Sequence, residues 1–262
     1  MRRHDSVAFM GGAHVFPGGR VDEADTIADP EQWCDGVRDA VARASDRAQD
    51  EAIAFHVAAI RELFEEAGVL LARDGGRRIV EMHEGDSQRY DACRRDLLEQ
   101  RLTMRELAER EGLRLALDAL ALFAHWVTPG VETRRFDTYF FLAVAPEVQH
   151  AAHDERETTQ GTWMPPAEAL DRCLAGEIAL PPPTWTTLRW LSRCASAGEA
   201  WQWAVSRPRP VPRVQPCIDD RGDGTRVIML PGDPLCPAVA GFDAAESRFV
   251  LANGRWSPVA PE

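Results

Sequence analysis

Lysine is absent from this chain of 262 residues, and all 30 basic residues are arginine. Chemistry that needs a lysine amine, such as Schiff-base formation, is therefore excluded. The 42 acidic residues outnumber the arginines and give a formal net charge of −12. Because nonspecific nucleic-acid binding needs a basic surface, we expect no nucleic-acid partner.

Long apolar runs and closely spaced cysteines are also missing. No stretch approaches the roughly 20 apolar residues of a transmembrane helix, and the N-terminal MRRHDSVAFM lacks the apolar region of a signal peptide. The six cysteines contain no CxxC pair, so we expect reduced thiols in a cytoplasmic protein without a membrane partner. They are Cys34, Cys93, Cys173, Cys194, Cys217 and Cys236.

Residues 56–69, HVAAIRELFEEAGV, predict a helix with one acidic face. Glu62, Glu65 and Glu66 follow the i, i+3, i+4 spacing that stacks side chains on one side of a helix, beside Arg61. An apolar stripe on the opposite side would anchor the helix to a core. The stripe consists of Ile53, Val57, Ile60, Phe64 and Val69.

Three carboxylates within one helical turn repel one another unless a cation lies among them. Oxygen ligands of this kind suit Mg²⁺ or Mn²⁺. Taken alone, the pattern is more typical of a solvated acidic surface than of a metal site. Gly68 is placed to end the helix in the left-handed conformation.

A second motif, residues 16–19 with the sequence FPGG, predicts a tight turn followed by Asp22 and Asp25. Gly18 and Gly19 permit positive φ and close approach of the backbone to a ligand. By itself, such a turn with two acids is an ordinary loop in most proteins.

The remaining pattern alternates helices and strands. Helices are expected at 29–41, within 86–113, from 165 onward and at 184–194, and Thr103 with Glu106 fits a capping box. Strands are expected at 69–71, 120–127, 136–144 and 162–164. From residue 139 onward the strand at 136–144 is aromatic and apolar, which is typical of a central strand.

Taken together, the two motifs resemble the box of the Nudix hydrolases, Gly-x5-Glu-x7-Arg-Glu-U-x-Glu-Glu-x-Gly-U, in which U is apolar. The second half matches at Arg61, Glu62, Leu63, Glu65, Glu66, Gly68 and Val69. Gly19 takes the glycine position, and Asp25 stands in place of the first glutamate. The family pattern has seven residues where this chain has 35, so we place an insertion at 26–53.

Residues 16–25 read FPGGxxDxxD, which resembles the signature of the coenzyme A diphosphatase branch of that family. The insertion, W-x-TP at 126–129, RRFDT at 134–138 and MLPGD at 229–233 resemble the long-insertion members of this branch. Such members usually carry an apolar strand ahead of the residues that align with 2–4, where this chain begins. Either the start has been placed too late or that strand is absent.

The resemblance implies an α/β protein with the Nudix fold, an α/β/α sandwich around a mixed central sheet. We place this domain at residues 1–205. Residues 206–216 are rich in proline and predict an extended linker. The part that follows, to residue 262, is expected to be a small β-rich extension with hairpin turns at Asp223-Gly224 and Asn253-Gly254.

The resemblance further implies metal-dependent hydrolysis of the diphosphate in coenzyme A or acyl-coenzyme A. The products would be 4′-phosphopantetheine or its acyl form and 3′,5′-ADP. Glu62, Glu65 and Glu66 would hold Mg²⁺ or Mn²⁺. Arg61 is expected to pair with Asp25 and so to orient the ligand helix.

Several roles have more than one candidate. The general base could be Glu62 or a loop acid such as Glu155 or Glu157. Substrate contacts are expected from the following residues: Gly18, Gly19, Arg20, Arg134 and Arg135. The Arg134–Arg135 pair is also typical of a solvated strand edge. Six tryptophans could stack an adenine, although tryptophan is more typical of a core; they are Trp126, Trp163, Trp185, Trp190, Trp201 and Trp203.

Two other functions are compatible with the same motifs. One is hydrolysis of a different nucleotide derivative, such as ADP-ribose, a dinucleotide or a nucleotide sugar. The other is a catalytically silent Nudix module that binds a nucleotide and regulates a partner. The three intact carboxylates favour an enzyme, because a binding module does not need mutually repelling groups. We expect a small-molecule nucleotide substrate and a possible homodimer.

Overall fold

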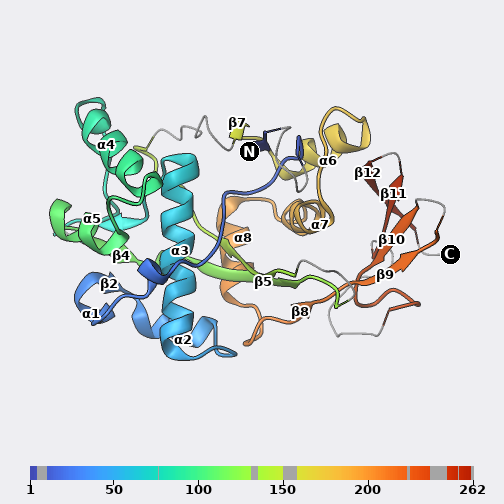
Figure 1. Ribbon diagram of the computed structural model, residues 1–262, viewed down its shortest axis with the longest axis horizontal. Coiled ribbons are helices and arrows are strands. Elements are labelled where there is room, and N and C mark those ends of the chain that lie inside the picture. The colour runs from blue at the N-terminus through green and yellow to red at the C-terminus, as the bar shows by residue number, and fades with distance from the viewer. Residues whose placement is uncertain are drawn as a thin grey trace.

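The computed structural model describes residues 1–4, 11–75, 77–130, 135–149, 158–222, 225–236, 247–252 and 254–260. It shows an α/β fold in which a long helix, α3 (Gln49–Ala67), crosses in front of strand β5 (Ala121–Val127) (Figure 1). The fold class predicted from the sequence is therefore confirmed. Within the described ranges, no helix is both long enough and apolar enough to cross a membrane.

In the described ranges, the helices lie between residues 23 and 119 and between residues 166 and 205. They are η1 (Glu23–Asp25), α1 (Pro30–Trp33), α2 (Val37–Arg43), α3, η2 (Glu84–Asp86), α4 (Ser87–Leu98), α5 (Met104–Glu111), η3 (Leu117–Ala119), α6 (Pro166–Leu174), α7 (Pro182–Leu191) and α8 (Ala197–Val205). The strands besides β5 are β1 (Arg2–Arg3), β2 (Cys34–Asp35), β3 (Ala72–Arg73), β4 (Arg114–Ala116), β6 (Asp137–Leu142), β7 (Thr158–Gln160), β8 (Arg213–Val214), β9 (Cys217–Asp220), β10 (Arg226–Met229), β11 (Arg248–Ala252) and β12 (Arg255–Val259).

Strand pairing among the described residues is divided over four sheets, two of them mixed. In the order β6-β5-β8, strand β5 pairs antiparallel with β6 and parallel with β8. Every residue of β5 is buried, whereas β6 begins with exposed residues. The prediction that residues 136–144 form a central strand is therefore wrong, because β5 takes the middle position and leaves β6 at an edge.

The insertion at 26–53 does not contain one continuous helix. The helix expected at 29–41 is divided into α1 and α2 by β2, which pairs parallel with β4. Gly36 follows β2 with φ +75° in tight contact with Asp118, and a side chain there would overlap Asp118. The first helical segment ends at Trp33, with Cys34 already extended, and the left-handed Gly36 is the residue from which α2 begins. Tertiary pairing of β2 therefore overrides the helical periodicity.

Two predicted strands lie a few residues from the observed ones. Residues 69–71 are buried but form no ladder, because the side-chain amide of Gln149 bonds the N–H and C=O of Leu70 at 2.9 and 3.0 Å. The neighbouring strand is β3, at Ala72–Arg73. Residues 162–164 are not a strand either, because the partner strand β1 pairs with residues 158–160 instead.

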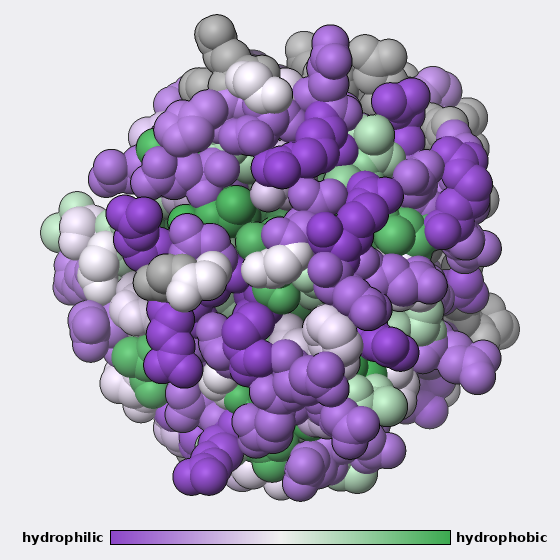
Figure 2. Space-filling view, turned by 90° about the vertical axis from the view of Figure 1, so that its left-hand side faces the viewer, coloured by the Kyte–Doolittle hydropathy of each residue, from purple (hydrophilic) through white to green (hydrophobic). Residues whose placement is uncertain are grey.

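Helices α4 and α5 lie within 86–113, where one or two surface helices were expected. The capping box at the start of α5 is present, with Glu106 N donating to Thr103 Oγ1 at 3.2 Å and Thr103 N donating to Glu106 Oε2 at 2.8 Å. The side of the molecule that carries these helices is mainly hydrophilic, with small and scattered hydrophobic patches (Figure 2). This surface is consistent with solvent contact along the two helices.

Most of the core is formed by two clusters of apolar side chains. The first surrounds the apolar stripe of α3 and includes Leu115 and Leu117. The second surrounds β5, α7 and α8 and contains five of the six tryptophans that were considered for adenine stacking: Trp126, Trp185, Trp190, Trp201 and Trp203. Trp163 is 74% exposed. The tryptophans therefore act mainly as core residues, as their residue type favours.

The proline-rich segment 206–216 packs against the sheet. Arg213 and Val214 of β8 pair with His125 and Trp126 of β5, and Val211 is buried. The segment is extended, as its prolines predict, but a parallel strand anchors it. The domain boundary placed after residue 205 stays a prediction.

The C-terminal extension is a four-stranded antiparallel sheet in the order β12-β11-β10-β9, which confirms the expected hairpins. Asp223, Gly224 and Asn253 of the expected turns lie outside the described residues. The sheet forms one end of the molecule, opposite α4 and α5 (Figure 1).

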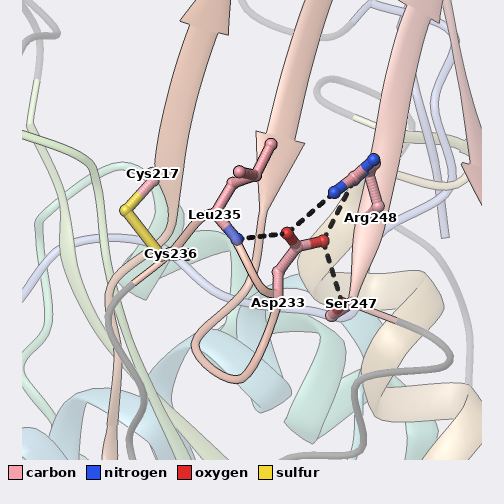
Figure 3. The surroundings of a disulfide bond; sticks show 6 residues. All are labelled: Cys217, Asp233, Leu235, Cys236, Ser247 and Arg248. Atoms are coloured by element: carbon pink, nitrogen blue, oxygen red, sulfur yellow. Dashed lines mark hydrogen bonds and ion pairs between the residues drawn. A yellow bond between two sulfur atoms is a disulfide. The ribbon is translucent and has the colours of Figure 1, made fainter. Parts of the chain in front are cut away.

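A disulfide between Cys217 and Cys236 ties β9 to the loop after β10 (Figure 3). The expectation that all six cysteines are reduced is therefore wrong for this pair, whose 19-residue separation in sequence carried no pairing signal. Beside it, the buried carboxylate of Asp233 accepts two bonds from Arg248, at 2.9 and 3.0 Å, and one from Ser247 at 3.1 Å. The MLPGD motif thus has a structural role, since its aspartate fastens the loop to β11.

Candidate active site

Helix α3 positions the acidic residues of the second motif. Its apolar stripe is almost fully buried, which fixes the rotation of the helix about its axis. Gly68 ends the helix with φ +70°, and its N–H donates to Phe64 O at 2.9 Å. These features confirm the helix, its apolar side and its glycine cap as predicted.

The glycine turn lies directly against the acidic side of α3, although 48 residues separate Gly18 from Glu66. Gly18 N donates to Glu66 Oε2 at 2.9 Å. A side chain at position 19 would overlap the carboxylate of Glu62 and displace it from its partners. The two halves of the interrupted motif therefore meet on one side of the domain.

Arg61 is the centre of the ion-pair network at this site, and only 8% of it is exposed. Its Nε and Nη2 donate to the two oxygens of Asp25 at 2.8 and 3.0 Å, so the expected pairing is present. Its Nη1 donates to Glu62 Oε1 and to Glu65 Oε2, each at 2.9 Å. A further bond at 2.7 Å to the carbonyl of Arg20 ties the glycine turn to the same guanidinium.

Three carboxylates, those of Asp25, Glu62 and Glu65, are partly or fully buried and all bond the guanidinium of Arg61. Burial raises the pKa of Glu62 to about 7; Arg61 opposes the rise and Glu65 adds to it. Burial likewise raises the pKa of Glu65, against the effect of Arg61. The arrangement therefore has an excess of negative charge in a region with little water, which a further cation would offset.

The donor set fits a hard divalent cation in chemical type and in charge. In the described part of the chain, however, no three ligating side chains already converge as a metal site. Glu62 and Glu65 point at Arg61, and Glu66 bonds the backbone of Gly18. Shared ligation by all three residues therefore requires some of these carboxylates to turn.

The expected substrate contacts are only partly brought together. Gly18, Gly19 and Arg20 are exposed beside the acidic side of α3. Arg135 is exposed close to Asp137, whose carboxylate pairs at 2.6 Å with Arg47, just ahead of α3. About 20 Å of helix separates the first residue of α3 from Glu62, so the structure does not place Arg135 beside the carboxylates.

Three further candidates, Arg134, Glu155 and Glu157, lie outside the described residues. The catalytic and binding roles assigned to the acidic residues, the glycines and the arginines stay predictions.

Arg94 on α4 also contacts the acidic end of α3, and nothing in the sequence indicated this contact. Its guanidinium bonds the carbonyls of Glu65 and Glu66 at 2.7 and 2.9 Å. No local spacing links α4 to α3, so only the packing of the two helices reveals it.

Comparison with known proteins agrees with this geometry. The profile of the NUDT19 Nudix domain matches residues 35–191. A human protein named acyl-coenzyme A diphosphatase NUDT19 is 32% identical over 278 residues, covering 90% of this chain and 71% of its own. The Xenopus laevis protein of the same name is 27% identical over 284 residues, covering 97% of this chain and 74% of its own.

A solved structure is also similar. The crystal structure of a Nudix hydrolase from Alicyclobacillus acidocaldarius matches with a TM-score of 0.60 and 29% sequence identity. The match covers 77% of this chain and 85% of that one. With the two halves of the motif assembled around Arg61, these similarities show that the chain belongs to the Nudix hydrolases, in the family of the NUDT19 Nudix domain.

Proposed function

We propose that this protein hydrolyses the diphosphate of coenzyme A or acyl-coenzyme A. Water would cleave the P–O–P anhydride, giving 4′-phosphopantetheine or its acyl form and 3′,5′-ADP. The substrate class is supported by the relatives named acyl-coenzyme A diphosphatase. The observation that carries the catalytic part is the closure of the interrupted box, in which Gly18 donates to Glu66 across the insertion.

The metal in this proposal is Mg²⁺ or Mn²⁺, held by Glu62, Glu65 and Glu66. When bound, such an ion neutralises phosphate charge and activates water for attack on phosphorus. The chain supplies the carboxylate oxygens and a site with little water around Glu65, which is 8% exposed. Both features favour binding of a hard cation.

The surrounding residues position these ligands. Arg61 holds Glu62 and Glu65, and Asp25 holds Arg61 through two bonds, so the acidic side of α3 has a defined arrangement before substrate binds. The absence of a side chain at Gly19 leaves room for the Glu62 carboxylate. Glu62 remains one candidate for the general base, beside the two loop acids outside the described residues.

A direct test compares four substrates in the presence of Mg²⁺: coenzyme A, an acyl-coenzyme A, 3′-dephospho-coenzyme A and ADP-ribose. We expect 3′,5′-ADP from the first two by chromatography and mass spectrometry. kcat/KM should be lower for the dephospho form, because a site built to bind the 3′-phosphate is left unpaired. Faster cleavage of ADP-ribose than of coenzyme A would reject the proposed substrate.

The variant that tests the metal-ligand role is Glu65→Gln, which removes a charge and keeps the size of the side chain. We expect folding to be retained and turnover to fall by about 100-fold or more, as for loss of a metal ligand. Turnover near that of the wild type would reject the proposed role of Glu65. A wild-type protein that binds nucleotide without any turnover would indicate the silent module instead. The cytoplasmic location and the homodimer stay predictions.

A further inference from the structure

Helix α4 packs directly against the C-terminal half of α3. The rings of Tyr90 and Phe64 meet edge to face with centroids 6.5 Å apart, and Cys93 is fully buried in the same core cluster. One turn after Tyr90, the side chain of Arg94 reaches the end of α3. Its Nε donates to Glu65 O at 2.7 Å and its Nη2 donates to Glu66 O at 2.9 Å.

These two carbonyls belong to the last turn of α3, where the carbonyl groups have no partner within the helix. The Gly68 cap satisfies the carbonyl of Phe64. The planar guanidinium of Arg94 then bonds two more carbonyls at once and puts a positive charge at the negative end of the helix dipole. The final turn is thereby held by a side chain from a neighbouring helix.

The residues whose carbonyls are bonded are the ones whose side chains would ligate the metal. A fixed peptide at Glu65 and Glu66 fixes their Cα–Cβ directions, and therefore the region that their carboxylates can reach. The Gly18 bond to Glu66 acts on the side chain, whereas the Arg94 bonds act on the backbone. The two sets of contacts are therefore not redundant.

We propose that Arg94 is a positioning residue for the metal site, which it preorganises by holding the last turn of α3 against α4. This inference rests on the proposed function, since it assumes that Glu65 and Glu66 ligate the metal. Without Arg94 the last turn can fray, and binding of the cation must then order it again. Removal of a group that orients metal ligands typically weakens metal binding about 10- to 100-fold.

The test measures Mn²⁺ binding by electron paramagnetic resonance in the absence of substrate, and Mg²⁺ activation of hydrolysis separately. The variant is Arg94→Ala, and the matched control is Arg95→Ala, an exposed neighbour whose Nε bonds only within α4, to Asp91 O. Glu65→Gln identifies the signal of this site against weak Mn²⁺ binding elsewhere on an acidic protein.

For Arg94→Ala we expect a Kd for Mn²⁺ at least about tenfold higher, a similar rise in the Mg²⁺ concentration for half-maximal activity, and a kcat at saturating metal within about threefold. Arg95→Ala should match the wild type. A lower melting temperature with an unchanged Kd for Mn²⁺ would show a purely structural role and overturn the proposal.

If Arg94→Ala does not fold, Arg94→Lys provides the test. Lysine keeps the charge but lacks the planar fork that bonds both carbonyls. An intermediate Kd for Mn²⁺ is expected, and a wild-type Kd in the folded variant would overturn the proposal. If the wild type does not cleave coenzyme A, only the proposed function is rejected, because the Mn²⁺ titration still decides the role of Arg94.

Discussion

Replacement of Asp25 by asparagine removes the negative charge of the buried partner of Arg61 and keeps the size of the side chain. Asp25 is 1% exposed, and its two oxygens accept three bonds. Two come from Arg61, and the third comes from Asp22 N at 2.8 Å. An asparagine amide has one acceptor end only, so at least one of these buried donors would face an NH₂ group.

The expected cost follows from burial. Removing one partner of a buried ion pair costs about 3–5 kcal/mol. Arg61 keeps Glu62, Glu65 and the Arg20 carbonyl, so we expect the lower end, about 3 kcal/mol. Asp22 provides the matched control from the same motif, since its carboxylate is 40% exposed and lies 3.8 Å from Arg61 Nη2. Asp22→Asn should cost no more than about 1 kcal/mol.

Urea unfolding monitored by circular dichroism measures both variants, with the slope m compared to confirm equal exposure on unfolding. Turnover is measured separately, under conditions in which both variants are folded. Asp25→Asn should also reduce turnover, because the two bonds by which Asp25 orients the guanidinium that positions Glu62 and Glu65 are weakened. Equal losses of stability in the two variants, each below about 1 kcal/mol, would refute the reasoning that the Asp25–Arg61 pair organises the site.

Two further predictions concern stability. His56 is fully buried, and burial lowers its pKa to about 4 despite a bond between Nδ1 and Ala52 O. Between about pH 6.5 and pH 4, His56 is protonated in the unfolded chain but neutral in the folded chain. The free energy of unfolding therefore falls by up to about 3 kcal/mol as the pH falls from 6.5 to 4. Urea midpoints should fall less steeply with acid in His56→Gln than in the wild type, and parallel curves would contradict this assignment. Reduction of the Cys217–Cys236 disulfide should lower stability by about 3 kcal/mol, given its 19-residue separation. Cys194→Ser is the control, and a reductant effect that persists in Cys217→Ser would contradict the prediction.

Helix α3 was predictable in detail because its determinants are local. The apolar spacing, the positions of Glu62, Glu65 and Glu66, and the glycine stop all act within a few residues of each other. A backbone with 3.6 residues per turn then fixes which side chains share a face, whatever the rest of the chain does. The family resemblance also linked the glycine turn to this helix, which local physics could not have done across the insertion.

Predictions failed where distant segments decided the local structure. The helical pattern at 29–41 is interrupted because residues 34–35 pair with β4, far along the chain. Residues 69–71 have the composition of a strand, but the side chain of Gln149 takes the place of a neighbouring strand at Leu70. Among the described strands, the aromatic strand β6 pairs with β5 and lies at an edge, whereas β5 is central because the proline-rich segment adds β8 to its other side.

The sequence by itself determined the acidic helix, its cap and the family to which the chain is similar. Only the tertiary structure decided that Arg61 also bonds Glu62 and Glu65, that Arg94 holds the last turn of α3, and that Cys217 meets Cys236. The physical reason is range. Backbone geometry sets the direction of side chains within one turn, whereas contacts between elements depend on how separate apolar faces pack, and the spacing of residues along the chain does not specify that packing.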